Sequence, residues 1–156
     1  MANKTFSSWS QIEAFLKKHI DDALNKEVAQ HVKEEIQTSV SDTVYAAGEP
    51  EVYQRRGGNA YGGMGNSLGT GSLGDPNEMN HTVRDGELSV TNDAEPDRPW
   101  WRNLAEAIEF GYADKDTWYS QPRPFMKSAT ENMKDSGSHV EVMKDALKKR
   151  GLDVID

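Results

Sequence analysis

Residues 7–47 read SSWSQIEAFLKKHIDDALNKEVAQHVKEEIQTSVSDTVYAA, and this stretch decides the fold. It contains neither glycine nor proline, the residues that most often interrupt regular structure. Apolar side chains recur at every fourth position, which is a helical period. The residues of this stripe are Ile12, Leu16, Ile20, Leu24, Val28, Val32, Ile36, Val40 and Val44. The sequence therefore predicts a helical segment over 7–47, started by one of two overlapping capping boxes at Ser8 and Ser10.

The spacing of the stripe limits how such a helix can pack. Because an α-helix has 3.6 residues per turn, a strict four-residue repeat rotates around the axis by roughly 40° at each step. One straight helix could not keep this stripe against one flat partner. Either the helix breaks near Asn25 into two short helices that pack on one small core, or it stays long and its far half docks on another subunit.

Glycine dominates the next part of the chain. A short strand is expected over 51–56, and eight of the eighteen residues in 57–74 are glycine. Such a segment loses much entropy when it is ordered and offers few side chains for packing, so we expect a long mobile loop. The glycines of 69–74 are spaced as in dinucleotide-binding loops, but the pattern requires a strand before it and a helix after it. No nucleotide site is therefore expected.

Residues 79–92 carry the clearest strand signal. Apolar and polar side chains alternate on both sides of Asp85-Gly86, a dipeptide typical of a two-residue hairpin turn because both positions need a positive φ. With these two residues in the turn, the larger side chains fall on one face of the hairpin. The residues of that face are His81, Val83, Leu88 and Val90.

The last third of the chain predicts helices. One is expected over 100–110, and Gly111 is suited to end it. Residues 124–150 are expected to hold two further helices that meet at Gly137, the first opened by a proline and the second by a Ser138-x-x-Glu141 capping box.

These elements define an α+β fold in a single domain over 1–156. It consists of a long N-terminal helix or helix pair, a small antiparallel sheet with a β-hairpin, and two C-terminal helices. The net charge is −8, from 26 acids against 18 bases, which argues against a protein that binds nucleic acid through its phosphates. We expect no membrane segment and no secretory signal, since the sequence lacks the apolar runs that these require.

The sequence carries no pattern of catalytic or ligand-binding residues. It has no cysteine, and its four histidines are not spaced to bind a metal from one helix turn. Nothing assembles a nucleophile, a base and an oxyanion donor. We therefore expect no enzyme activity, no cofactor and no metal.

Two motifs in the last third resemble a known family. Ala107-Ile108-Glu109-Phe110-Gly111, followed after a variable stretch by Pro122-Arg123-Pro124-Phe125 at the start of a helix, resembles the tail-completion, or head–tail joining, proteins of long-tailed bacteriophages. These are often labelled minor capsid proteins. Tyr53-Gln54-Arg55-Arg56 and His139-Val140-Glu141 look like the Gram-positive phage branch of that family.

The resemblance implies a structural role. Such proteins are made in the host cytoplasm and reside in the virion neck, where they cap the tail tube as a hexameric ring. The implied partners are the tail-tube protein, the head-completion or stopper protein, and further copies of the chain, while DNA passes through the channel without specific binding. The glycine-rich loop over 57–74 would become ordered against a neighbouring ring. The rival interpretation is a cytosolic helical adaptor that binds a partner through its N-terminal helix.

The residue types of the motif suggest how it works. Gly111 permits a backbone turn that other residues resist. Phe110 and Phe125 are expected to be apolar anchors beside it. Arg123 lies between two prolines that fix its backbone, and Glu109 is its expected ionic partner, within the subunit or across to a neighbour.

Overall fold

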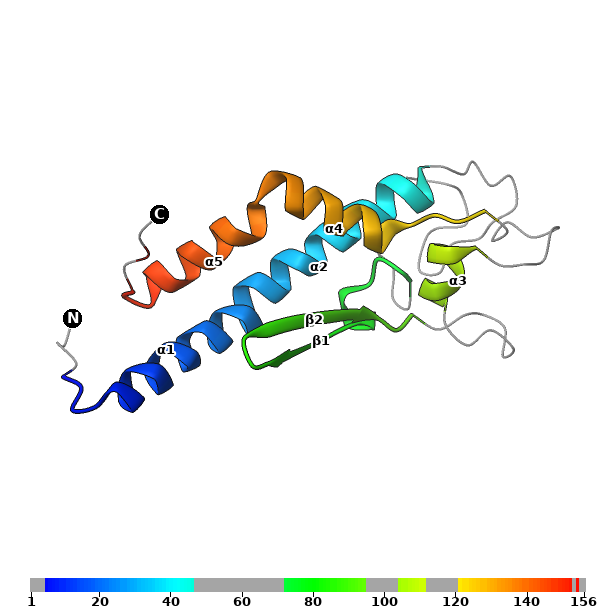
Figure 1. Cartoon of the computed structure of the whole chain (residues 1–156). Coiled ribbons are helices and arrows are strands. Elements are labelled where there is room, and N and C mark those ends of the chain that lie inside the picture. Colours follow the sequence, from blue (N-terminus) through cyan, green and yellow to red (C-terminus); the bar gives the residue numbers. More distant parts are fainter. Residues whose placement is uncertain (1–4, 47–71, 95–103, 112–120, 153, 155–156) are drawn as a thin grey trace.

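The computed structural model describes residues 5–46, 72–94, 104–111, 121–152 and 154. The strand expected over 51–56, most of the glycine-rich loop and the first part of the helix expected over 100–110 lie outside these residues. The fold class is α+β, as predicted (Figure 1). The helices are α1 (Trp9–Ala23), α2 (Ala29–Ser39), α3 (Leu104–Phe110), α4 (Phe125–Ser136) and α5 (Ser138–Lys149), and the strands are β1 (Met79–Arg84) and β2 (Glu87–Asn92).

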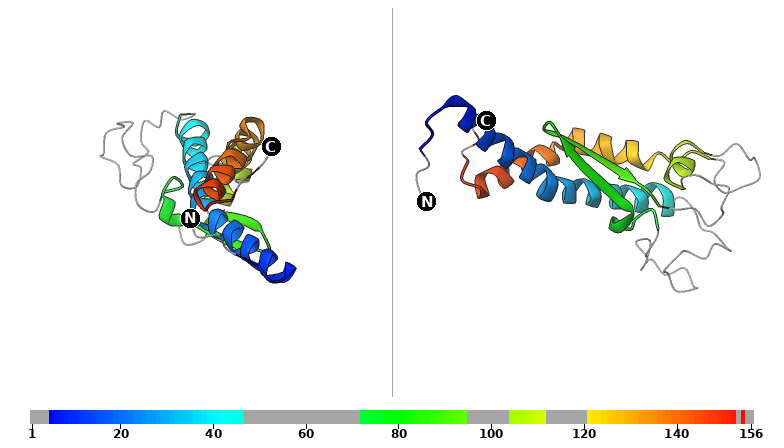
Figure 2. Two further views of the ribbon diagram at one scale, coloured as in Figure 1. Left: turned by 90° about the vertical axis from the view of Figure 1, so that its left-hand side faces the viewer. Right: turned by 90° about the horizontal axis from the view of Figure 1, so that it is seen from below.

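The long N-terminal helix runs along the length of the described fold, with the other elements on its sides. Helices α4 and α5 lie along one side of it, and the β1–β2 hairpin lies along another (Figures 1 and 2). The start of α1 and the end of α5 lie at the same end of the molecule. Among the described helices, none is long and apolar enough to cross a membrane.

The N-terminal helix does not break near Asn25. It continues through two π-turns, a first at Leu24–Val28 and a second at Val40–Tyr45, where the backbone is wound more loosely than an α-helix. In the first, the Ala29 N–H donates to the Leu24 carbonyl, five residues back. The extra residue per turn counteracts the drift of the four-residue repeat. As a result, one stripe stays against the core along the second half of the helix, formed by Val28, Val32, Ile36, Val40 and Val44.

The hairpin forms in the predicted register. Val83 pairs with Leu88 and His81 with Val90, and Asp85 and Gly86 form the turn with φ values of +50° and +79°. The face that carries these four side chains is half-buried, whereas the alternate residues between them are exposed.

The core joins residues from each of the described ranges 5–46, 72–94, 104–111 and 121–152, although α1 and α5 contribute none of them. It contains Ile36, Val40, Val44, Leu73, Met79, Ala94, Ala105, Ile108, Phe125 and Ala129. The prediction of a mobile loop over 57–74 is wrong for its last three residues, because Leu73 is buried in this core. Asn92 donates to the Leu73 carbonyl at 2.7 Å and Gln37 to the Gly74 carbonyl at 2.7 Å, which fixes this backbone between β2 and α2. Residues 57–71 lie outside the described part.

Helices α3 and α4 end at the glycines predicted to end them, but the predicted cap of α5 differs. Gly111 and Gly137 have φ values of +77° and +65°, and Gly137 ends α4. The predicted Ser138-x-x-Glu141 capping box does not form. The Ser138 hydroxyl instead lies 2.8 Å from Nε2 of His31 on α2, because the tight connection between α4 and α5 turns this side chain toward the long helix.

Candidate functional site at the junction of α3 and α4

The candidate site lies where the end of α3 is beside the start of α4, and it consists of six residues of the resemblance motif: Glu109, Phe110, Gly111, Arg123, Pro124 and Phe125. The Arg123 N–H donates to the Ile108 carbonyl at 2.8 Å, which holds the extended segment before α4 against α3. The Phe125 N–H donates to the Arg123 carbonyl at 2.8 Å, and Pro124 is the residue immediately before the helix rather than its first residue. The two motifs thus form one structural unit although they are separate in the sequence.

Glu109 caps α4 from the neighbouring helix. Its Oε2 accepts from the Met126 N–H at 2.8 Å and its Oε1 from the Lys127 N–H at 3.1 Å. These amides belong to the first turn of α4, where backbone donors have no partner within the helix. Pro124, at the cap position, has no side-chain acceptor to offer them. A carboxylate placed there also interacts favourably with the positive end of the helix dipole.

The sequence predicted Glu109 as the ionic partner of Arg123, within the subunit or across to a neighbour, but the bonds that Glu109 makes in this structure are to backbone amides of α4. Its pairing with Arg123 of a neighbouring subunit stays a prediction. Arg123 is half-buried, and its Nη1 atom is shielded from solvent. Its backbone joins α3 to α4 through the two hydrogen bonds already described.

The two phenylalanines of the motif have opposite environments. Phe125 is fully buried in the core, and its carbonyl accepts from the buried Ser39 hydroxyl at 2.7 Å. Phe110, the last residue of α3, is 72 % exposed. The sequence predicted two apolar anchors near Gly111, and within the described part of the chain Phe125 packs in the core whereas Phe110 does not. Since α3 ends at Phe110 and turns at Gly111, the ring projects from a fixed backbone into solvent.

A second cluster, which the sequence did not reveal, surrounds the first π-turn. Arg150 at the end of α5 forms a two-pronged ion pair with Glu27, at 2.7 Å from Nη2 to Oε2 and 3.1 Å from Nη1 to Oε1. Nη2 also donates to the Asp22 carbonyl at 3.3 Å. On the hairpin side, Nε2 of His81 lies 3.1 Å from the Asn25 carbonyl. Arg150 follows two lysines in the sequence and its partner Glu27 is 123 residues away, so no local pattern indicates this pair.

This ion pair makes stability depend on pH. The hydrogen bond from Arg150 holds the pKa of the Glu27 carboxyl below its ordinary value of 4.5. Because the folded-state pKa is depressed, the stabilisation is complete above the unfolded pKa and is lost as pH falls through the folded one. We expect the unfolding free-energy difference between wild type and Glu27→Gln to stay constant from pH 7 to about 5 and to shrink progressively below 4.5, as measured by urea denaturation.

The matched control is Glu131→Gln, which removes an exposed pair with Lys127 at 3.8 Å. Exposed pairs of this kind contribute little, so this difference should be small at every pH. A wild-type minus Glu27→Gln difference that does not change between pH 7 and 3 would contradict the assignment.

The described residues contain no group of three or more His, Asp or Glu side chains arranged to hold a metal ion. Of the dinucleotide-like glycine stretch, only residues 72–74 are described, and there Gly74 is buried and uses its carbonyl to accept from Gln37.

The geometry above defines a small α+β protein in which a long helix carries a hairpin and two C-terminal helices, with α4 capped by α3. A family model named YomN matches residues 8–149, so the chain belongs to the YomN family. This family is derived from Bacillus phage, which makes the chain a phage-related protein. No curated protein and no solved structure matches the chain.

Proposed function

We propose that this protein is a structural component of the virion neck, which caps the phage tail tube as a hexameric ring and joins it to the head-completion ring. Membership of a phage-derived family supports a role in the phage. The resemblance of the motif to tail-completion proteins supports the finer assignment, because its two segments, which are separate in the sequence, come together at the junction of α3 and α4. On this proposal the chain is not an enzyme and needs no cofactor.

The observation that carries the proposal is the exposure of Phe110. Its backbone is fixed, since α3 is hydrogen-bonded to the segment before α4 and Glu109 beside it caps α4. An exposed aromatic ring on a rigid support loses little entropy when it is buried, which is typical of residues that contribute most to a protein interface. In a ring, Phe110 would enter a neighbouring subunit or an adjoining ring.

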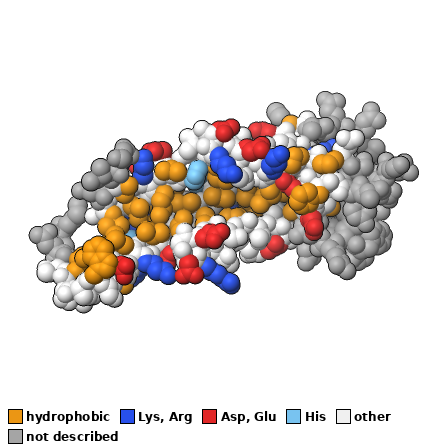
Figure 3. Space-filling view, in the orientation of Figure 1, with side chains coloured by type: hydrophobic (Ala, Val, Ile, Leu, Met, Phe, Trp, Pro, Cys, Tyr) orange, Lys and Arg blue, Asp and Glu red, His pale blue; other side chains and the backbone are white. Residues whose placement is uncertain are grey.

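The surface supports subunit packing as well. On the face seen in Figure 3, hydrophobic side chains gather in a band along the length of the molecule, between the side of α4 and α5 and the side of the hairpin. Apolar surface of this extent is typical of proteins that bury it in an assembly. The net charge of −8 suits a channel through which DNA passes without being held.

One observation favours the alternative, a cytosolic adaptor that binds a partner through the N-terminal helix. Trp9 and Leu16 on α1 are 73 % and 39 % exposed, so this helix presents apolar side chains to solvent. Phe110 and Trp9 lie on different elements, α3 and α1, which allows the two functions to be separated by mutation.

Phe110→Ala tests the neck assignment. We expect the tagged variant, purified from a lysate that produces the corresponding particles, to recover tail-tube and head-completion subunits at least about tenfold less well than wild type, because truncating a central interface aromatic costs about 2 kcal/mol or more. Mass spectrometry identifies the recovered proteins, and electron microscopy of tails counts the capped ends.

Trp9→Ala is the matched control, since it truncates an equally exposed aromatic outside the motif. It should leave recovery unchanged. Loss of binding in Trp9→Ala with normal binding in Phe110→Ala, together with recovery of only a cellular partner, would overturn the neck assignment in favour of the adaptor.

A further inference from the structure

Helix α1 takes little part in the core. Among the described residues of α1, only Ala23 is buried. By contrast, α2 buries Ala29, Ile36 and Ser39, although it is the shorter helix. The aromatic contacts of Phe6 and Phe15, with ring centroids 5.2 Å apart, join the segment before α1 to α1 itself. They would therefore stay intact if α1 moved as a unit.

The first π-turn lies where this weakly packed helix meets the strongly packed one. A π-turn replaces the regular α-helical bonding by a looser pattern, here with the Ala29 N–H bonded to the Leu24 carbonyl. Sites of this kind are where helices bend. A bend at Leu24–Val28 would change the direction of α1 and leave the buried stripe of α2 in place.

Arg150 joins the two sides of this turn. Its guanidinium bonds to the carbonyl of Asp22, which belongs to α1, and to the carboxylate of Glu27, which lies in the turn. Arg150 is also bonded to the end of α5, since its Nη1 donates to the Ala146 carbonyl at 2.8 Å. The Arg150 side chain is 15 % exposed, so these bonds are partly protected from water.

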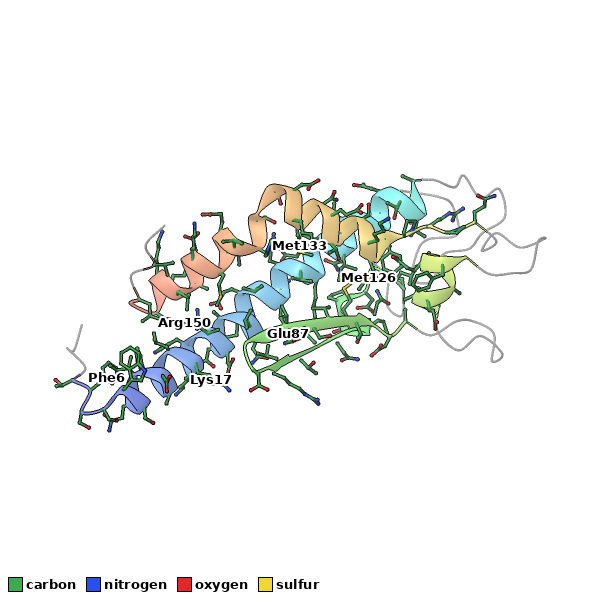
Figure 4. The ribbon with its side chains drawn as sticks, viewed as in Figure 1. Phe6, Lys17, Glu87, Met126, Met133 and Arg150 are labelled. Atoms are coloured by element: carbon green, nitrogen blue, oxygen red, sulfur yellow. The ribbon has the colours of Figure 1, made fainter. Side chains whose placement is uncertain are left out.

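The polar contacts that α1 and the first π-turn make with the hairpin are weaker. Figure 4 shows Arg150 at the end of α5 above α1, and Lys17 on the opposite side of α1, toward the hairpin. Lys17 pairs with Asp85 at 3.1 Å, but both side chains are mostly exposed. Exposed ion pairs of this kind contribute little to stability. The contact between His81 and the Asn25 carbonyl touches the turn itself and not α1.

We propose that α1 is an arm that moves about the π-turn at Leu24–Val28, and that Arg150 is the latch that holds it against α5. The arm carries Trp9 and Leu16, so the latch controls the direction in which these exposed apolar side chains point. The inference is independent of the neck assignment, because it concerns the motion of the free chain.

The experiment measures distances between spin labels by pulsed electron paramagnetic resonance. The chain has no cysteine, so introduced cysteines are labelled selectively. One pair spans the turn, with Ser10→Cys on α1 and Lys134→Cys on α4, both at exposed positions. The second pair stays within the body, with Thr91→Cys on β2 and Lys134→Cys. Each pair is placed in wild type, Arg150→Ala, Arg150→Lys and the control Lys149→Ala.

We expect Arg150→Ala to roughly double the width of the distance distribution of the arm pair and to leave the body pair unchanged, as for hinge motion of one element. Arg150→Lys, which keeps the charge but cannot form the two-pronged pair, should give an intermediate width. Lys149→Ala removes the neighbouring cation, which is exposed, and should resemble wild type.

Two results would overturn the proposal. The first is an unchanged arm distribution in Arg150→Ala. The second is equal broadening of both pairs in Arg150→Ala and Arg150→Lys, since Arg150 would then support the whole fold rather than the position of α1. The Tm of each variant is measured alongside to identify loss of folding.

Discussion

Phe125→Ala is expected to lower the free energy of unfolding by about 3–5 kcal/mol, the range for removing a fully buried aromatic ring. Phe125 has no exposed surface, and it contributes to the core from the first position of α4. Its removal opens a cavity between α4 and α2 that these elements cannot close without losing the bond from Ser39 to the Phe125 carbonyl. For a chain of this length, the Tm should fall by about 10 °C in a calorimetric scan.

Phe110→Ala is the matched control, because it makes the same substitution at the other phenylalanine of the same junction. With the ring 72 % exposed, we expect a stability change within about 0.5 kcal/mol of wild type. If both variants lost the same stability, the opposite environments assigned to the two rings would be wrong.

Glu109→Ala is expected to cost about 1–2 kcal/mol of stability, comparable to the loss of a helix cap. The change removes both acceptors from the Met126 and Lys127 amides and takes a negative charge from the start of α4. Glu109→Gln keeps one acceptor oxygen without the charge, so its loss should be smaller. Hydrogen exchange should show the two amides of α4 losing protection in both variants.

Glu131→Ala provides the comparison for Glu109, since it removes an exposed carboxylate from the middle of the same helix. It should change stability by only a few tenths of a kcal/mol. If Glu109→Ala behaved like Glu131→Ala, or left exchange of the Met126 and Lys127 amides unaltered, the capping role would have to be given up.

The features that were predictable from sequence are those fixed by near neighbours. Asp85 and Gly86 adopt the positive φ values that a two-residue turn requires, so they fix the register of the hairpin without help from the rest of the fold. The helical segment was likewise set by a local period and by the lack of glycine and proline within 7–47.

The features that were missed depend on residues far apart in the chain. Glu109 reaches the amides of α4 only because α3 packs beside the start of that helix, and its residue type alone suggested an ion pair instead. Leu73 lies among glycines, so no periodicity marked it as part of the core. The different environments of the two phenylalanines were also not predictable from sequence, because they depend on how the end of α3, at Phe110, and the start of α4, at Phe125, lie in the fold.

The first π-turn also sets the angular phase between the two halves of the long helix. Each residue of an α-helix advances by roughly 100° around the axis. A π-turn takes up one more residue than an α-helical turn for about the same rotation, so deleting one residue from Leu24–Val28 would restore continuous α-helix and leave each face of α1 pointing in nearly its present direction. A single-codon deletion within the regular helix α2, by contrast, would turn all fifteen residues of α1 by roughly 100° relative to the core while changing none of their side chains.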